Sequence, residues 1–151
     1  MQQLSRRRAL ALGAAGAALS LVGLPKAAQA TPESAAAEIA KFAAGKTPVA
    51  GKISIELPEI AENGNTVPLA ISGDAPMTDD DYVTDVLVLA DGNPNPGVAT
   101  FHFTPLSGKA DASTRIRLAT TQNIVVTAKT SKGAVYTASK LVKVTIGGCG
   151  G

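Results

Sequence analysis

The stretch Tyr82-Val-Thr-Asp-Val-Leu-Val-Leu-Ala90 is apolar on both faces of the strand that it predicts. Its side chains alternate between a first face with Val86, Val88 and Ala90 and a second face with Val83, Leu87 and Leu89. A strand with two apolar faces must be covered on both sides. We therefore expect either a central strand of a sandwich, with a helix or loop outside it, or a strand whose second face is a subunit interface.

Six other stretches of the chain show the period-two alternation of half-buried strands. Their apolar positions are Ile53, Ile55 and Leu57; Val67, Leu69 and Ile71; Ala99, Phe101 and Phe103; Ile116 and Leu118; Ile124, Val126 and Ala128; and Val142, Val144 and Ile146. Seven short strands, with turns rich in Gly, Pro and Asn and with no long helix, predict an all-β fold, an immunoglobulin-like antiparallel β-sandwich. The pattern of an antibody-type domain is missing, because Trp is absent and the single Cys is terminal.

A short helix is expected before the strands, from Thr31 to Ala44. Thr31 can cap its first turn, Pro32 is tolerated at the first helical position, and Gly45 can end it. The sequence leaves open whether this helix packs on the sandwich or on a partner.

The N-terminus reads as an export signal over residues 1–30. Consecutive arginines at Arg6, Arg7 and Arg8 precede an alanine-rich apolar run, and Ala28-Gln29-Ala30 supplies the small-x-small cleavage pattern. The paired arginines favour the twin-arginine route to the periplasm over the general secretory route. Because the apolar run is short for a membrane span, we expect cleavage and no membrane anchor afterwards.

The charge balance changes when the signal is removed. The full chain has 14 Lys and Arg against 12 Asp and Glu, but four of the basic residues lie within residues 1–30. The mature domain would carry a net charge near −2. Nothing in this balance favours binding to nucleic acid.

The only cysteine of the chain, Cys149, lies in the terminal sequence Gly147-Gly148-Cys149-Gly150-Gly151. We expect residues 147–151 to form a flexible arm outside the core, because glycine adopts conformations closed to other residues. No lysine, arginine or histidine in the arm would lower the pKa of the thiol, so it is not expected to be an activated nucleophile by itself. Two interpretations remain open: a thiol that enters the active site of another protein, or a cysteine that only forms an intermolecular disulfide.

Other candidate sites in the sequence are weak. His102 is the only histidine and should point away from the side of the strand that carries Phe101 and Phe103. The acidic run of residues 79–81 lacks the spacing of a calcium loop and reads as a solvated turn. Arg115 and Arg117 share a face and read as exposed or interface residues. We expect no metal site, no cofactor and no catalytic centre, so the chain is not expected to be an enzyme.

The arm Gly-Gly-Cys-Gly-Gly resembles the tail of the SoxY family, the covalent sulfur carriers of bacterial thiosulfate oxidation. The resemblance extends through the segments 57–65 (Leu-Pro-Glu-Ile-Ala-Glu-Asn-Gly-Asn), 92–97 (Gly-Asn-Pro-Asn-Pro-Gly), 99–105 (Ala-Thr-Phe-His-Phe-Thr-Pro) and 113–118 (Ser-Thr-Arg-Ile-Arg-Leu). It implies a sandwich domain over residues 31–146 that carries sulfur intermediates, as thiosulfonate and persulfide, on Cys149. It also implies a heterodimer with SoxZ and transient contact with the enzymes SoxXA, SoxB and, where present, SoxCD.

Two other classes of protein compete with this interpretation. Ubiquitin-like sulfur carriers end in Gly-Gly and use a terminal thiocarboxylate, whereas here a cysteine precedes the last glycines and the chain reads as exported. The other competitor is an exported structural or adhesion sandwich whose cysteine only crosslinks chains.

Overall fold

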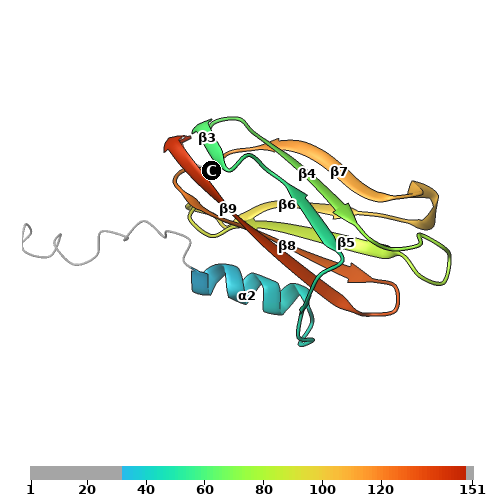
Figure 1. Ribbon diagram of the computed structural model, residues 1–151. Coiled ribbons are helices and arrows are strands. Elements are labelled where there is room, and N and C mark those ends of the chain that lie inside the picture. Colours follow the sequence, from blue (N-terminus) through green and yellow to red (C-terminus); the bar gives the residue numbers. More distant parts are fainter. Residues whose placement is uncertain (1–31, 149–151) are drawn as a thin grey trace, which may run out of the picture.

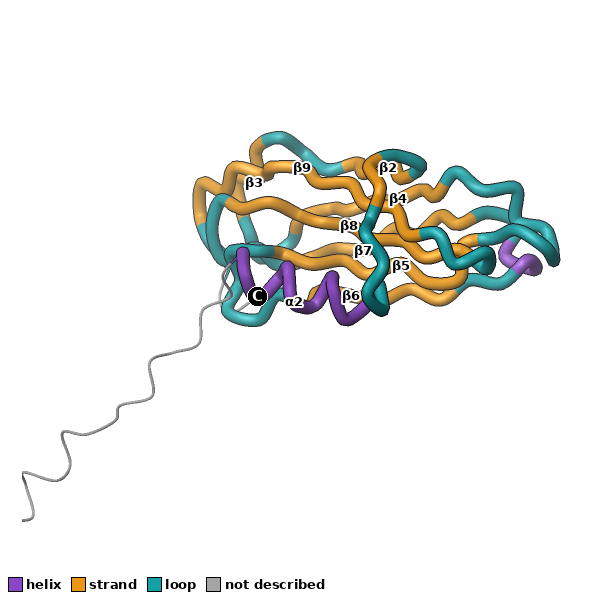
Figure 2. The backbone as a smooth tube through the Cα atoms, turned by 90° about the horizontal axis from the view of Figure 1, so that it is seen from below, coloured by secondary structure: helices purple, strands orange, loops and turns teal. Residues whose placement is uncertain are grey.

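The computed structural model describes residues 32–148 and shows two β-sheets packed against each other, with one helix on the outside (Figures 1 and 2). The larger sheet has the order β1 (Val49–Ala50), β9 (Val135–Ile146), β8 (Gln122–Thr130), β5 (Val83–Ala90) and β6 (Gly97–His102), and β3 (Ile60–Asn63) also pairs with β9. The smaller sheet has the order β2 (Ile53–Glu56), β4 (Val67–Gly73) and β7 (Ala110–Ile116). The predicted all-β, immunoglobulin-like sandwich is therefore confirmed.

The C-terminal strand differs most from the expected pattern. The sequence predicts only its last part, whereas β9 runs over 12 residues and pairs antiparallel with β8. Two short strands that the sequence pattern missed, β1 and β3, pair with the other edge of β9 and run parallel to it. The sandwich is therefore not purely antiparallel: β8 pairs with β9 up to Val142, and β3 pairs with the end of β9 from Lys143 to Ile146.

The doubly apolar strand β5 lies between β8 and β6, as the interpretation of a central strand requires. Val86, Val88 and Ala90 are buried in the core between the sheets. Val83 also faces this core, although the alternation places it on the opposite face. The reason is a β-bulge: the pairing of β5 with β8 shifts between Val83 and Asp85, and the extra residue turns Val83 inward.

The helix α2 (Pro32–Phe42) covers the outer face of the larger sheet (Figure 2). It contacts β5, and its Phe42 ring lies 4.3 Å from the Nζ of Lys129 on β8. The helix ends as expected before Gly45, which has a φ of 80°. Lys46 then ties the following loop to the β8–β9 hairpin by donating to the carbonyl oxygen of Gly133 at 2.6 Å.

The position of this helix decides between the two interpretations of the second face of β5, cover by the chain itself or a subunit interface. Lys129 contacts α2 and also pairs with Asp85 on β5. The side chains of Asp85, Leu87 and Leu89 lie on the same face of β5. Leu89 on this face is only 1% exposed. The expected alternative of a subunit interface at Leu89 is therefore wrong, because the side chain is already buried within the chain itself.

We predict that Leu89→Ala lowers the free energy of unfolding by about 2–5 kcal/mol, the usual effect of truncating a buried leucine. Urea denaturation followed by circular dichroism measures this change. Leu106→Ala is the matched control, because Leu106 is 98% exposed and its truncation should change stability by no more than about 0.5 kcal/mol. Equal effects of the two substitutions would contradict the burial of Leu89.

Among the residues that the structure describes, none forms a helix long and apolar enough to cross a membrane.

Candidate functional site

The base of the C-terminal tail is held by backbone hydrogen bonds. Beyond β9, the amide of Gly148 donates to the carbonyl oxygen of Leu118 at 2.8 Å. The amide of Leu118 donates to the carbonyl oxygen of Gly64 at 2.8 Å, and the amide of Gly64 donates to the carbonyl oxygen of Ile146 at 2.7 Å. Three segments that lie far apart in the sequence thus meet at Leu118, and Figure 1 shows β9 ending beside β3, the strand that leads to Gly64.

The first two glycines of the tail therefore differ from the flexible arm that we expected. Gly148 is buried, and a Cβ added to it would lie 2.7 Å from the carbonyl oxygen of Gly64. A Cβ added to Gly147 would collide with the carbonyl oxygen of Ala119. Glycine is needed at these two positions because the backbone of another segment lies in close contact there. Flexibility of the tail is therefore not the reason for glycine at these positions. The remaining site residues of the prediction, Cys149, Gly150 and Gly151, lie outside the described residues.

Asn93 holds the segment around Leu118 from the other side. Its side chain is 2% exposed, donates to the carbonyl oxygen of Arg117 at 2.9 Å and accepts from the amide of Ala119 at 2.9 Å. Its Oδ1 also accepts from the Nε2 of Gln122 at 2.8 Å. The side chain of Asn93 thus holds the peptide groups on both sides of Leu118, and it fixes the carbonyl that accepts from the amide of Gly148.

Sequence reasoning missed Asn93 as a site residue. It read the segment 92–97 only as a turn that matches the SoxY pattern. The buried position of Asn93, which the sequence does not give, distinguishes it from the exposed Asn95 two residues later.

His102 has a partner on the surface of the larger sheet. Its side chain points away from the core as predicted, and its Nδ1 lies 2.6 Å from Oδ1 of Asp85. Partial burial acts to raise the pKa of the Asp85 carboxyl, but hydrogen bonds from Thr84 and His102 and the nearby charge of Lys129 outweigh it, so the pKa lies below its usual value. The side chain of His102 is 74% exposed, so this contact lies on the surface of the sheet.

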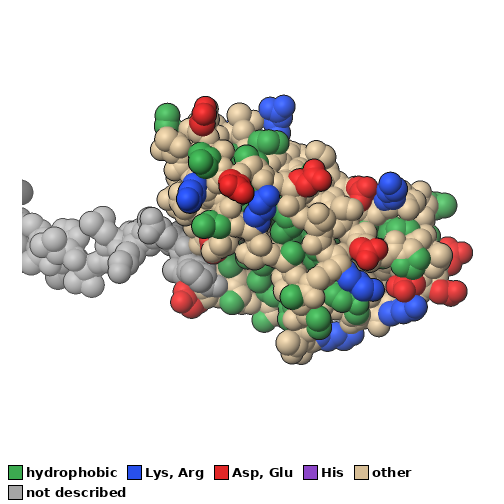
Figure 3. Space-filling view, viewed as in Figure 1, with side chains coloured by type: hydrophobic (Ala, Val, Ile, Leu, Met, Phe, Trp, Pro, Cys, Tyr) green, Lys and Arg blue, Asp and Glu red, His purple; other side chains and the backbone are tan. Residues whose placement is uncertain are grey.

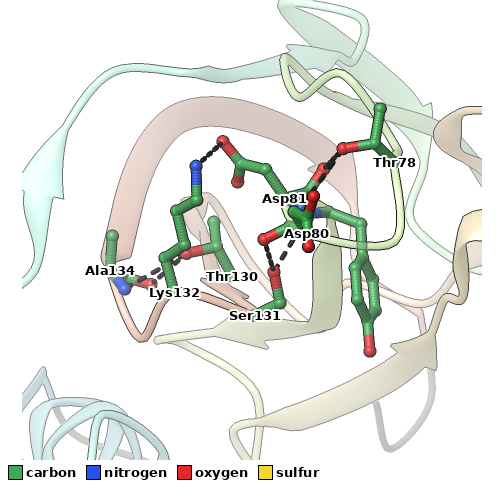
Figure 4. Close-up of polar contacts among 8 residues, drawn as sticks. Thr78, Asp80, Asp81, Thr130, Ser131, Lys132 and Ala134 are labelled. Atoms are coloured by element: carbon green, nitrogen blue, oxygen red, sulfur yellow. Dashed lines mark hydrogen bonds and ion pairs between the residues drawn. The ribbon is translucent and has the colours of Figure 1, made fainter.

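The acidic run of residues 79–81 forms a turn, as predicted, and belongs to a network at the β8–β9 hairpin (Figure 4). The carboxylate of Asp81 pairs with Lys132 at 3.0 Å, and the amide of Asp81 donates to the hydroxyl of Thr78 at 3.2 Å. Ser131 accepts from the amide of Tyr82 and donates to the carbonyl oxygen of Asp80. The register of β5 with β8 places this network near Val83, at the end of the sheet away from Gly148.

No group of three His, Cys, Asp or Glu side chains suited to a metal ion occurs within residues 32–148. A surface depression of about 530 Å³ lies beside β2 and β4. Its lining includes Lys140, whose Nζ already donates to the carbonyl oxygen of Leu57 at 2.8 Å. Arg115 and Arg117 are exposed, as expected.

The described residues form a single β-sandwich domain whose C-terminal backbone, up to Gly148, is held by hydrogen bonds to the fold. A family model described as "Sulfur oxidation protein SoxY" matches residues 39–149. The chain belongs to the SoxY family, and the predicted resemblance is confirmed.

Solved structures agree with this assignment. The sulfur carrier protein SoxY from Chlorobium limicola f thiosulfatophilum is 35% identical, with a TM-score of 0.61 and coverage of 74% of this chain and 96% of that chain. A superoxide reductase (neelaredoxin) from Ignicoccus hospitalis is 21% identical, with a TM-score of 0.55 over 76% of this chain and 93% of that chain. The second likeness shows a shared fold alone. A comparison with curated protein sequences gives no match.

Proposed function

We propose that the chain is a covalent sulfur carrier of thiosulfate oxidation, in which the thiol of Cys149 holds the sulfur. The observation that carries this proposal is the position of the only cysteine, bonded to a glycine that the fold fixes at the end of β9. Membership of the SoxY family and 35% identity to a sulfur carrier support the same role. The chain itself acts as the scaffold that bears the substrate, and partner enzymes perform the chemistry.

The first step joins thiosulfate to the cysteine. The thiol of Cys149 loses its proton, its sulfur forms a bond with the outer sulfur of thiosulfate, and the two electrons released pass one at a time through SoxXA to two molecules of oxidised cytochrome c. The product is the cysteine S-thiosulfonate. Because the thiolate is the reactive form and no basic residue adjoins Cys149 in the sequence, the enzyme must supply the charges that favour it.

The second step releases sulfate from the thiosulfonate. Water attacks the terminal sulfonate sulfur in the hydrolase SoxB, the bond between this sulfur and its neighbour breaks, and sulfate leaves. The cysteine retains one added sulfur as a persulfide. Where SoxCD is present, this enzyme oxidises the retained sulfur to a sulfonate, with water as the source of oxygen and oxidised cytochrome c as the electron acceptor. A second hydrolysis then releases sulfate and regenerates the thiol.

A heterodimer with SoxZ is part of the proposal, and exposed apolar side chains at one edge of the larger sheet support it. Val49, Ile60, Leu141 and Ile146 lie on β1, β3 and β9 and are between 51% and 65% exposed. Figure 3 shows apolar side chains among charged ones over β3 and β9. Apolar residues within a mixed polar surface are typical of an interface between proteins.

We further propose that residues 1–30 direct the chain to the periplasm by the twin-arginine route. Replacing Arg6 and Arg7 by lysine is expected to retain most of the precursor in the cytoplasm, because the route reads the arginine pair. Immunoblots of cell fractions measure this retention, with the wild-type chain as control. Normal export of the variant would contradict the route.

The intact mass of the purified protein tests the function and separates the competing classes. A carrier shows the mass of a sulfur or thiosulfonate adduct that disappears on reduction, on a chain that begins at Thr31. A ubiquitin-like carrier would show a terminal thiocarboxylate. A crosslinking cysteine would show only a disulfide-linked dimer, and this result would overturn the proposal.

A further inference from the structure

We propose that a backbone clamp, formed by Gly64, Leu118 and Gly148 and braced by Asn93, fixes the point at which Cys149 leaves the domain. The three glycine and leucine residues are joined by the hydrogen bonds described above, and Asn93 holds the two peptide groups that flank Leu118. This inference rests on the proposed carrier function and adds positioning residues to it. In a carrier, the clamp sets where the sulfur is presented.

The clamp depends on the absence of side chains where its segments meet. A Cβ on Gly64 would collide with the carbonyl oxygen of Leu118 and would lie 2.7 Å from the amide nitrogen of Gly148. A Cβ on Gly148 would lie 2.8 Å from the carbonyl carbon of Gly64 and 3.0 Å from the amide nitrogen of Asn65. The neighbouring atoms are backbone atoms, so they cannot rotate away as the end of a long side chain can. At each of these two positions, only glycine leaves room for the backbone of the other segment.

The clamp shortens the part of the tail that carries the thiol. A free arm that begins after Ile146 would let three residues extend at about 3.3–3.6 Å each. With Gly148 held by its hydrogen bond to Leu118, any such extension begins two residues later in the sequence. The partner enzyme must therefore approach the end of the sandwich that carries Gly64 and Leu118.

Two residues of the clamp and the asparagine that braces it come from three of the segments that resemble SoxY. Gly64 lies in segment 57–65, Asn93 in segment 92–97 and Leu118 in segment 113–118. These segments are dispersed in the sequence, and hydrogen bonds join all three at the base of the tail. Their meeting at this point is what a role in presenting Cys149 requires.

The test compares Gly148→Ala with the wild-type mature protein. We expect the amide of residue 148, and that of Gly64, to exchange with solvent at least about tenfold faster in the variant, because the added Cβ breaks the clamp. Amides of β8, such as that of Val126, should keep their protection. In a reconstituted thiosulfate-oxidising system, the variant should lose about tenfold in kcat/KM with SoxXA, while a small thiol reagent titrates Cys149 at the wild-type rate.

Gly97→Ala is the matched control, because the nearest atom to its added Cβ is Oδ1 of Asn95 at 3.7 Å, an ordinary contact. Its exchange and turnover should equal those of the wild type. Exchange of the wild-type Gly148 amide at the rate of an unstructured peptide would overturn the clamp, as would unchanged turnover in Gly148→Ala. A wild-type protein that accepts no sulfur would instead overturn the proposed function, and amide exchange would still decide the clamp.

Discussion

Cys149→Ser is expected to reduce thiosulfate-dependent cytochrome c reduction to the background of a reconstituted system that lacks this chain. A serine hydroxyl cannot form the sulfur–sulfur bond that holds the cargo, and it is far less nucleophilic than a thiolate. No other residue can replace the thiol, because Cys149 is the only cysteine in the chain. The loss should be complete, with the unfolding transition unchanged.

A relocated thiol tests whether position matters as well as chemistry. Leu106 is almost fully exposed and lies in a short 3₁₀ helix (Pro105–Ser107) between β6 and β7, at the end of the sandwich away from Gly148. Adding Leu106→Cys to the Cys149→Ser variant should restore a titratable thiol without restoring cytochrome reduction. Activity in Cys149→Ser alone, or full recovery in the double variant, would contradict a carrier site at the end of β9.

Asn93→Ala is expected to lower the free energy of unfolding by about 2–4 kcal/mol, because it leaves the partly buried Arg117 carbonyl and Ala119 amide without their side-chain partner. The change also removes an acceptor from Gln122. Chemical denaturation measures the loss. We expect a parallel loss of turnover with SoxXA, since the segment that receives Gly148 is released.

Asn95→Ala is the control for this substitution. Asn95 belongs to the same segment but is exposed, and its side chain bonds only the amide of Gly97 among the contacts described, at 3.2 Å. It should change stability by no more than about 0.5–1 kcal/mol. Equal losses in the two variants would show that the segment is sensitive to any change and would contradict the bracing role of Asn93.

The sequence predicts most of the sandwich because its strands bury alternate residues. Ile124, Val126 and Ala128 on β8 show why: all three are buried in the core, and polar or half-buried residues lie between them. Alternation cannot reveal β3, where Ala61 is the only buried residue. Nor does it reveal the first part of β9, where most side chains are half-buried. These segments pair through their backbones, which leaves little trace in the side-chain pattern.

The covering helix shows a similar limit. Its Ala-rich sequence and the stop at Gly45 predict the helix, but they do not say what it covers. The burial of Ala35 and Ala43, and the contact of Phe42 with Lys129, depend on a non-local approach to the larger sheet. The second apolar face of β5 therefore had two possible explanations until the position of the helix was known.

The sequence predicted which residue would carry the chemistry of the candidate site, but it did not predict the backbone contacts that hold the base of the tail. A single cysteine among terminal glycines is visible in any reading of the sequence. The hydrogen bonds among Gly64, Leu118 and Gly148 join backbone atoms of distant segments, and backbone contacts of this kind have no signature in residue type. The glycines were therefore interpreted as a source of flexibility, whereas at Gly147 and Gly148 they allow close packing.

The most direct test of the carrier function is the mass of the C-terminal tryptic peptide, which begins at Val144 and contains Cys149. The mature protein would be incubated with thiosulfate, SoxXA and oxidised cytochrome c, digested without reductant, and analysed by tandem mass spectrometry. The account predicts that the S₂O₃ group is found on Cys149 in this peptide, and that SoxB converts it to a single added sulfur. A peptide that stays unmodified while cytochrome c is reduced, or that occurs only as a disulfide, would contradict it.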